Sequence, residues 1–421
     1  MKQIQKKQIQ KIKLELPNMS VPINIDLSGK NLIVTGSNGC GKTSFIKSLN
    51  DRLISCTDPD KTMDKLSSNL IYARQEVSKG AVNSNYSYFK DRVSILEKEI
   101  EDVKRVVVSI VDENKLRQEY ADKQFVLSYY PAERQSNISV DNTRPSLNAL
   151  KAGEESKMLS EHFGVLFEKY LVAQKVIYND IVATQDMIAK PQADRIAKWL
   201  EKVQSDLRYL FEDTDLHLTY NREKQSFEIN QEGKSPFQFN ELSSGFSAII
   251  YIYSDLLMKV ELKDIPADKL NGIVLIDEID AHLHVSLQRR ILSFFTHAFP
   301  SIQFIVTTHS PFVVQSVDDA IIYDLSKREQ LEDLSMFSYQ AILEGLLGVT
   351  INSMSTEELL DELDDAINLD PFDVKKVSEL YLKLVVYEKN LSPEAALLLL
   401  KARKTLTNIG FDMSKFNFGQ K

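Results

Sequence analysis

Cysteine is scarce in this sequence, and long apolar runs are missing. Two cysteines, Cys40 and Cys56, stand among 421 residues, which is too few for a disulfide framework, and they lack zinc-type spacing. No apolar run approaches the roughly 20 residues that a membrane-spanning helix needs. The first 13 residues are rich in lysine, but no apolar block follows, so we expect an edge strand there, where lysine discourages pairing, and not a signal peptide. These absences predict a cytoplasmic protein without a membrane partner.

Basic charge is also in deficit. The chain has 51 Lys and Arg against 60 Asp and Glu, a net charge of −9. This acidic balance disfavours a surface built for nucleic acid, although a local basic groove could still contact DNA. The length allows roughly two or three domains with apolar cores of their own.

A glycine-rich loop lies between an apolar run at 32–34 and a helical-looking stretch at 44–54. Its residues are Gly36, Ser37, Asn38, Gly39, Cys40, Gly41, Lys42 and Thr43, which complete the pattern G-x-x-x-x-G-K-T. Glycines here let backbone N–H groups turn inward around a phosphate, and the helix start adds its dipole. We predict that this loop and Ser44 bind a nucleotide, with Lys42 at the β- and γ-phosphates and the Thr43 hydroxyl on Mg²⁺.

Two acids end a second apolar run. Residues 272–276 have the composition of a buried strand, and Asp277 and Glu278 follow directly. Paired carboxylates after a strand are common, but in a chain that also has an intact phosphate loop they usually take part in catalysis or metal binding. We predict that Asp277 holds the Mg²⁺ shell and that Glu278 orients and polarises the attacking water.

A third apolar run, at 304–306, leads to a histidine. His309 stands at the carboxyl end of this predicted strand, where doubly wound folds place their ligands. We therefore predict that His309 is catalytic and senses the γ-phosphate. His282 and His284 lie earlier in the chain, but no third ligand stands nearby, so a zinc site is disfavoured.

A serine-rich loop precedes the apolar run at 248–260. Ser243, Ser244 and Gly245 come just before this helical stretch and so offer hydroxyls and free N–H groups at a helix start. Taken alone, the segment predicts no more than a helix cap. Its place between the phosphate loop and the paired acids makes these three residues candidates for nucleotide contact.

The remaining segments indicate how the chain is organised. Alternating apolar residues predict strands at 12–16 and 23–27 and a hairpin at 216–229. Apolar residues spaced four and three apart from Phe89 to Ile110 predict one long helix. We expect it to pack on its own neighbour, with a dimerising coiled coil as the less favoured alternative.

The C-terminal part carries helix signals. After one more strand at 320–325, Ser355 begins a capping box, and Asp370 and Ser392 each precede a proline. These patterns predict helix starts, and Gly410 predicts a helix end. We therefore expect the rest of the chain to be helical.

The order of these motifs resembles that of the ATP-binding-cassette ATPases. The hairpin before Ser243, the segments 277–284 and 308–311, and the strand end at 130–134 resemble the OLD/RecF-like branch of these AAA-family ATPases. The resemblance implies an α/β fold: an ABC-type P-loop ATPase head with mixed β-sheets, helical or short coiled-coil insertions and a helical C-terminal region. It also implies ATP and Mg as cofactors. A homodimer or higher homo-oligomer is expected, in which the serine loop of one subunit closes on the nucleotide of the other.

The resemblance also requires a glutamine near the nucleotide. Gln135 follows a convincing strand at 124–130 and is our candidate, whereas Gln75, in a stretch that could be helical, is the alternative. On this basis we divide the chain into six parts. These are two head segments at 1–60 and 212–330, helical insertions at 61–122 and 147–211, a return strand at 123–146 and a helical C-terminal region at 331–421.

The C-terminal region lacks the strand-borne acids that the nuclease of many OLD-family proteins requires. An OLD-like head without its own nuclease resembles the ATPase subunits of bacterial antiphage systems such as PARIS and Septu. That resemblance implies a sensor or scaffold that controls a separate nuclease or toxin effector, with a phage-encoded trigger. The alternative is a RecF- or SMC-like DNA-repair ATPase that binds DNA, and the ATPase subunit of a transporter is less favoured.

Overall fold

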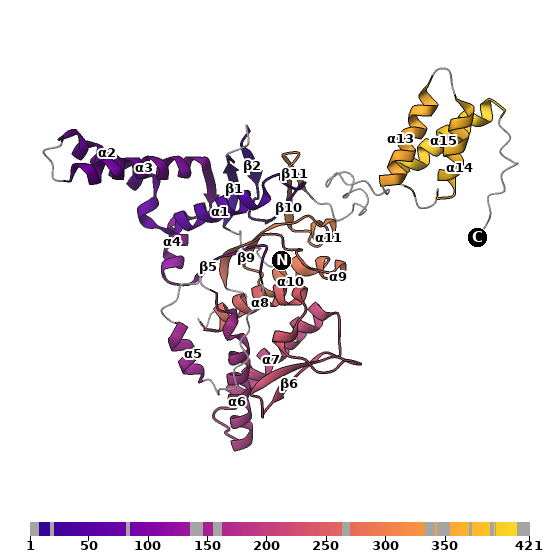
Figure 1. Ribbon diagram of the computed structural model, residues 1–421. Coiled ribbons are helices and arrows are strands. Elements are labelled where there is room, and N and C mark those ends of the chain that lie inside the picture. Colours follow the sequence, from indigo (N-terminus) through magenta and orange to yellow (C-terminus); the bar gives the residue numbers. More distant parts are fainter. Residues whose placement is uncertain are drawn as a thin grey trace. The chain divides into compact units, whose positions relative to one another are not determined.

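Two units, Met1–Met336 and Phe337–Lys421, make up the chain in the computed structural model (Figure 1). The structure describes residues 8–16, 21–80, 85–134, 146–154, 162–262, 270–332, 342, 354–369, 373–387, 391 and 393–410. The predicted division after residue 330 falls within a strand of the first unit, Glu329–Glu332.

A six-stranded sheet forms the centre of the first unit. Its strands are β3 (Asn31–Thr35), β5 (Phe125–Tyr130), β8 (Asn271–Ile276), β9 (Ile302–Thr307), β10 (Ala320–Asp324) and β11 (Glu329–Glu332). They lie in the order β11-β10-β3-β9-β8-β5, and neighbouring pairs are parallel except β10 with β11. All residues of β3, β9 and β10 are buried, as expected of strands covered on both faces. The predicted α/β class with mixed sheets is confirmed, whereas β11 lies where helix was expected.

A second, three-stranded sheet is antiparallel. It consists of β1 (Ile9–Leu14), β2 (Ile23–Asp26) and β4 (Val106–Ile110), with β1 in the centre. The prediction of an edge strand for this lysine-rich segment is therefore wrong. Lys11 and Lys13 are exposed, and Ile12 and Leu14 are buried, because side chains alternate between the two faces of a strand. The lysines mark the solvent face of a central strand.

Helix α1 (Lys42–Thr57) joins the two sheets into one core. It begins directly after the phosphate loop and buries Phe45, Ile46 and Leu49. These side chains belong to one apolar cluster with Ile12 of β1 and Val34 of β3. Burial of an apolar side chain of this size contributes about 1.5–3 kcal/mol, so the end of the phosphate loop is firmly held.

Helices α2 (Met63–Ser78) and α3 (Tyr86–Arg105) pack along each other through Leu66, Ala73, Leu96 and their neighbours. The expected packing of the heptad helix on its own neighbour is thus confirmed. The expected length is wrong, because α3 ends at Arg105 and the next residues form β4. Three consecutive valines at 106–108 favour a strand, in which β-branched side chains pack well.

The rest of the first unit is mostly helical. It contains α4 (Glu113–Ala121), α5 (Leu147–Glu154), α6 (Phe167–Thr184), α7 (Lys190–Phe211), α8 (Ser244–Leu262), α9 (Val285–Gln288), α10 (Ile291–Ala298) and α11 (Pro311–Val314). A hairpin of β6 (His217–Asn221) and β7 (Ser226–Asn230) appears where it was predicted. Among the helices that the structure describes, none is both long and apolar enough to span a bilayer.

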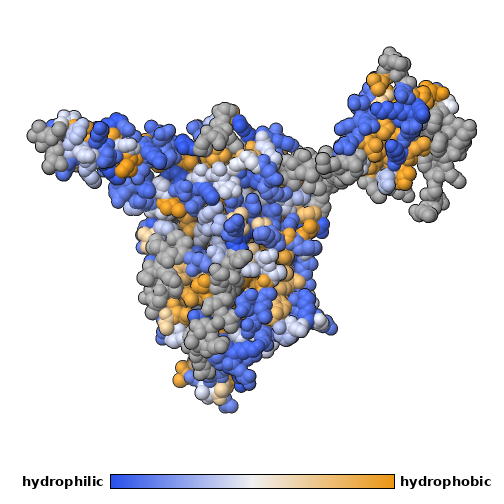
Figure 2. Space-filling view, viewed as in Figure 1, coloured by the Kyte–Doolittle hydropathy of each residue, from blue (hydrophilic) through white to orange (hydrophobic). Residues whose placement is uncertain are grey.

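The second unit contains α13 (Met354–Asn368), α14 (Val374–Val385) and α15 (Pro393–Asn408) around a core of its own that includes Leu363, Val377 and Leu406. Figure 2 shows hydrophilic and hydrophobic residues side by side on its surface. A capping box that begins at Ser355 predicts a helix from Thr356, and this is wrong by two residues because α13 begins at Met354. Asp373 caps α14, and the predicted cap at Asp370 lies outside the described residues.

Candidate nucleotide site

The ends of four parallel strands meet at one edge of the six-stranded sheet. β3, β9, β8 and β5 are neighbours in this order, so their carboxyl ends lie side by side. Backbone bonds continue past the strands: the N–H of Asp277 donates to Tyr130 O at 2.8 Å, and the N–H of Thr308 donates to Val34 O at 3.0 Å. The structure thus brings the phosphate loop, the paired acids and the histidine segment to the same edge.

The phosphate loop leads from β3 into α1 through Gly41, whose φ is 98°. Residues 37–39 at its apex are exposed, Cys40 and Thr43 are half-buried, and Ser44 is exposed. Lys42 is only 6% exposed, and its ammonium donates to Gly36 O at 2.8 Å and Ser37 O at 2.9 Å. The loop therefore presents backbone N–H groups and a cation at a helix start, which is an arrangement that attracts anions.

A serine far along the chain contacts the start of this loop. The hydroxyl of Ser326, in the turn between β10 and β11, accepts from the Ser37 N–H at 2.8 Å and lies 3.0 Å from the Ser37 hydroxyl. A Cβ on Gly36 would lie 2.7 Å from the Ser326 oxygen, so this close approach requires glycine. The sequence offered no pattern that links Ser326 to the loop.

One hydroxyl holds both predicted acids. Thr307, the last residue of β9, donates to Asp277 Oδ1 at 2.6 Å and accepts from the Glu278 N–H at 2.7 Å. Asp277 is 1% exposed, whereas Glu278 is half-buried and has a left-handed φ of 47°. Because a residue with a Cβ resists this conformation, the turn must be held by its surroundings.

Arg134 supplies much of that hold, and sequence analysis missed its role. This guanidinium, 7% exposed, donates to the carbonyls of Asp277 at 2.8 Å, Glu278 at 3.0 Å and Ile279 at 3.2 Å. It also donates to Pro131 O at 2.9 Å. The only available signal was its place at the end of the β5 segment, because carbonyl partners leave no trace in residue types.

His309 lies half-buried among charged groups. Burial and then the Lys42 ammonium lower the pKa of His309, against the opposing effect of the carboxylates of Asp280, Glu278 and Asp277. The imidazole is therefore neutral at pH 7. Its neighbours fix its backbone: the Thr308 hydroxyl donates to Asp280 at 2.5 Å, and the Ser310 hydroxyl donates to Gln288 at 2.7 Å.

The oxygen donors at this edge suit magnesium. Mg²⁺ prefers carboxylate and hydroxyl oxygens, which Asp277 and Thr43 provide. Only Oδ1 of Asp277 has a hydrogen bond within the described residues, which leaves Oδ2 available to a cation. His284 caps α9 with its side chain, and no group of three potential metal ligands from His, Cys, Asp and Glu occurs in the described part of the chain.

The serine loop begins α8. Ser243 and Ser244 are exposed, whereas Gly245 is buried. A Cβ on Gly245 would lie 2.7 Å from the His282 carbonyl oxygen, so glycine allows the helix start to pack on the segment after the paired acids. Phe246 stacks on Phe211 of α7 with ring centroids 4.1 Å apart.

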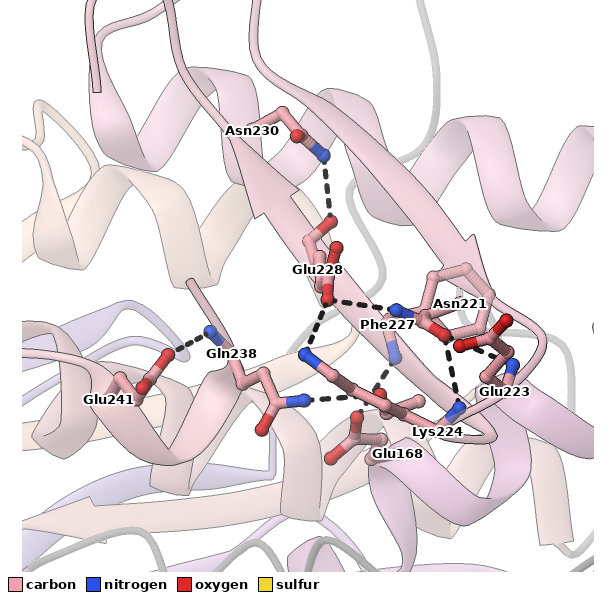
Figure 3. A network of polar contacts seen from close by, with 10 residues as sticks. Glu168, Asn221, Glu223, Lys224, Phe227, Glu228, Asn230, Gln238 and Glu241 are labelled. Atoms are coloured by element: carbon pink, nitrogen blue, oxygen red, sulfur yellow. Dashed lines mark hydrogen bonds and ion pairs between the residues drawn. The ribbon is translucent and has the colours of Figure 1, made fainter. Parts of the chain in front are cut away.

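A polar network supports the serine loop from the hairpin side (Figure 3). Gln238 and Glu241 form a reciprocal capping box before the loop. The Gln238 amide also donates to the Ser226 hydroxyl at 3.1 Å, and the next residue, Phe227, donates its N–H to Glu168 of α6 at 3.0 Å. Burial raises the pKa of the Glu168 carboxyl. The loop is therefore connected through β7 to the helical insertion.

Of the two glutamine candidates, the structure describes Gln75 alone. Gln135 lies outside the described residues. Gln75 is exposed on α2, which packs on α3 and not on the strands of the site.

This chain is similar to known proteins in sequence. Residues 32–315 match a family described as "AAA domain, putative AbiEii toxin, Type IV TA system". Over 163 residues the chain is 31% identical to "Septu protein PtuA" of Bacillus thuringiensis, a match that covers 35% of this chain and 41% of that protein. It is 25% identical over 395 residues to "Retron Vc95 probable ATPase" of Vibrio cholerae serotype O1 biovar El Tor, covering 77% and 76% of the two chains. The chain thus spans less than half the length of that PtuA protein.

A solved structure titled "SMC head domain from Thermotoga maritima" is similar in fold at a TM-score of 0.34, with 12% identity over 77% of this chain and 97% of that chain.

Proposed function

This chain belongs to the AAA-domain family described as "putative AbiEii toxin, Type IV TA system", and from that premise we propose that it binds ATP and hydrolyses it to ADP and phosphate. The single observation that carries the proposal is the Thr307 hydroxyl, which joins Asp277 and Glu278 at 2.6 and 2.7 Å. This hydroxyl supports the proposal because it holds the two adjacent residues that we assign to the metal and to the general base, at the edge of the sheet that also bears the phosphate loop.

Each residue of the site then has a distinct task. Backbone N–H groups of residues 36–44 and the Lys42 ammonium bind the phosphates, and Thr43 and Asp277 hold Mg²⁺, which neutralises charge on the phosphates when bound. Glu278 accepts a proton from the attacking water. The neutral imidazole of His309 contacts the γ-phosphate and so distinguishes ATP from ADP.

We further propose that two subunits close on two ATP molecules. Ser243 and Ser244 are exposed at the start of α8, where a helix N-terminus attracts anions. On this proposal the serine loop of one subunit completes the phosphate site of the other. The purpose of hydrolysis would then be to change the assembly state of the subunits, and not to make a product. The bound nucleotide would shift the population between the two assembly states.

The relatives suggest a biological setting. Proteins named as a Septu PtuA and as a retron ATPase are similar to this chain. We propose that this chain acts in antiphage defence in the cytoplasm, as a sensor or scaffold that controls a separate nuclease or toxin effector after a phage-encoded trigger. The support is similarity of family and motif.

The proposal is tested with the purified full chain and a matched pair of lysine variants. Lys42→Ala should abolish ATP binding and phosphate release. Lys47→Ala, an exposed lysine on the same helix, should leave both unchanged. Removal of Mg²⁺ with EDTA should stop turnover by the unmodified chain. Phosphate release by Lys42→Ala at the unmodified rate would refute the proposed site.

A further inference from the structure

Arg134 binds the turn that carries the two acids. Its planar guanidinium donates from Nη1 to Asp277 O at 2.8 Å and from Nη2 to Glu278 O at 3.0 Å and Ile279 O at 3.2 Å. One side chain thus contacts three successive carbonyls that lie more than 140 residues away in sequence. A lysine has no planar fork and could not reproduce this pattern.

This arrangement keeps a cation buried at a cost. Burial lowers the pKa of Arg134 to about 10, opposed by the carboxylates of Asp280, Asp277 and Glu278, so the group stays charged at neutral pH. All its hydrogen bonds in the described residues go to carbonyls, and its Nε is buried without a partner. A buried charge without a bonded counter-ion is expensive, and an orphaned donor calls for an explanation.

The explanation lies in the backbone of Glu278. Its φ of 47° lies in the left-handed region, which a residue with a Cβ resists. The turn also draws three carbonyl dipoles toward one point, where they repel one another unless a cation lies between them. Arg134 provides that cation at the carbonyl of Glu278, and the Thr307 hydroxyl accepts a hydrogen bond from the N–H of Glu278 at 2.7 Å. The peptide that carries the general base is held from both ends.

We propose that Arg134 is the positioning residue for Glu278: it fixes the left-handed turn that directs the base toward the attacking water. This rests on the proposed ATP hydrolysis and goes beyond it, because it assigns a role outside all of the motifs. Arg134 touches the backbone of the acid turn and not the reacting atoms, so it acts on the reaction through the position of Glu278. A misplacement of about 1 Å in a catalytic group can cost roughly a hundredfold in rate.

The first experiment separates chemistry from binding. In the full chain, Arg134→Lys should lower the single-turnover rate of ATP hydrolysis about tenfold or more, while the Kd for ATP stays within about twofold of the unmodified value. Arg117→Lys is the matched control, because Arg117 also donates to a backbone carbonyl, Cys56 O at 3.0 Å, away from the site. An unchanged rate, or an equal loss in ATP affinity, would overturn the assignment.

The second experiment excludes a merely structural role. In the Glu278→Gln background the base is already gone, so adding Arg134→Lys should not lower the residual rate further. A general disturbance of the fold would lower it in both backgrounds. Additive losses would therefore remove Arg134 as a positioning residue for Glu278. If the unmodified chain binds no ATP, the proposed function fails, and if it hydrolyses ATP while Arg134→Lys does so at the same rate, only this inference fails.

Discussion

At the scale of single residues, the role of Glu278 as general base gives the first prediction. Glu278 is half-buried, and its carboxylate is the group that we expect to polarise water. Glu278→Gln keeps the shape of the side chain but removes its basicity, so ATP should still bind while hydrolysis falls by about 10²–10⁴-fold. The measurement is single-turnover phosphate release together with ATP affinity.

Asp280, two positions after Glu278, provides a matched control. Asp280 accepts a hydrogen bond from Thr308 at 2.5 Å and has no proposed part in proton transfer. Asp280→Asn should therefore slow hydrolysis much less than Glu278→Gln does. Hydrolysis at the unmodified rate by Glu278→Gln would show that another group is the base.

Ser326 gives a second prediction at this scale. Its hydroxyl accepts a hydrogen bond from the Ser37 N–H at 2.8 Å and lies 3.0 Å from the Ser37 hydroxyl. It should therefore hold Ser37, the first residue of the loop apex, in place. Loss of one such bond costs roughly 0.5–1.5 kcal/mol. Ser326→Ala should therefore weaken ATP binding by about three- to tenfold, with kcat little changed, as measured by titration and steady-state kinetics.

The chain offers a close control for this change. The N–H of Ser326 donates to Asp324, two residues earlier, at 2.8 Å, and the N–H of Ser28 likewise donates to Asp26 at 3.1 Å. Within the described residues, the turn of Ser28 has no hydrogen bond to the phosphate loop. Ser28→Ala should leave ATP affinity unchanged. Equal affinities for the two variants would remove Ser326 from the site.

Sequence reasoning reached the residues whose side chains form motifs and missed those that act through the backbone. Lys42, Asp277 and His309 follow from spacing and from apolar runs, and the structure places them at one edge of the sheet. Arg134 and Ser326 bind carbonyl and amide groups far along the chain. A backbone group can belong to a residue of any type, so no pattern in the sequence reveals which residues Arg134 and Ser326 contact.

At the scale of elements, the same limit appears in the boundary between α3 and β4. The four-and-three spacing of apolar residues continues from Phe89 to Ile110, yet the helix stops at Arg105. Spacing alone could not reveal this: the seam runs on through Val107, but in β4 Val107 is exposed, and Val106 and Val108 are the buried residues. Pairing of β4 with β1 decides the outcome, and that partner lies about 100 residues earlier.

The serine loop carries the prediction that belongs to elements. Ser243 and Ser244 are exposed at the start of α8, so they are available to a second subunit. If the loop acts across the boundary, a Lys42→Ala chain and a Ser244→Arg chain should each be inactive alone. Mixed heterodimers should regain one intact composite site, and therefore up to about half the turnover per dimer that two equivalent sites give. The measurement is ATP hydrolysis after mixing tagged chains and isolating the heterodimer.

The control for this mixing is a pair of chains that both carry Lys42→Ala, which should stay inactive in any combination. Heterodimers of the two different variants that form but hydrolyse no ATP would show that the serine loop does not complete the partner's site.

At the scale of the whole molecule, the second unit has its own apolar core and contributes none of the site residues proposed above. Exposed apolar side chains also remain on it, among them Val386 at 73%, Leu397 at 65% and Tyr387 at 60%. Ordering these helices costs conformational entropy, and the proposed hydrolysis assigns this unit no purpose. Docking of the effector is the purpose that we predict.

Helix α13 is the surface on which that prediction is tested. It carries Glu357, Glu358, Asp361, Glu362, Asp364 and Asp365 and no Lys or Arg. Most of these acids are exposed, and Asp364 forms an ion pair with Lys401 of α15 at 3.3 Å. A dense, exposed charge of one sign favours a partner of the opposite sign, so we expect a basic surface on the effector.

Reversing the charge of four acids on α13, Glu357, Glu358, Asp361 and Asp365, to lysine should leave ATP turnover intact and weaken capture of the effector that co-purifies with the unmodified chain. The loss should grow smaller as salt rises, because screening already weakens the unmodified contact. Glu379→Lys on α14, also exposed, is the control for a charge change elsewhere in the unit. Undiminished capture by the fourfold variant at every salt concentration would exclude α13 and would direct the search to the helical insertions of the first unit.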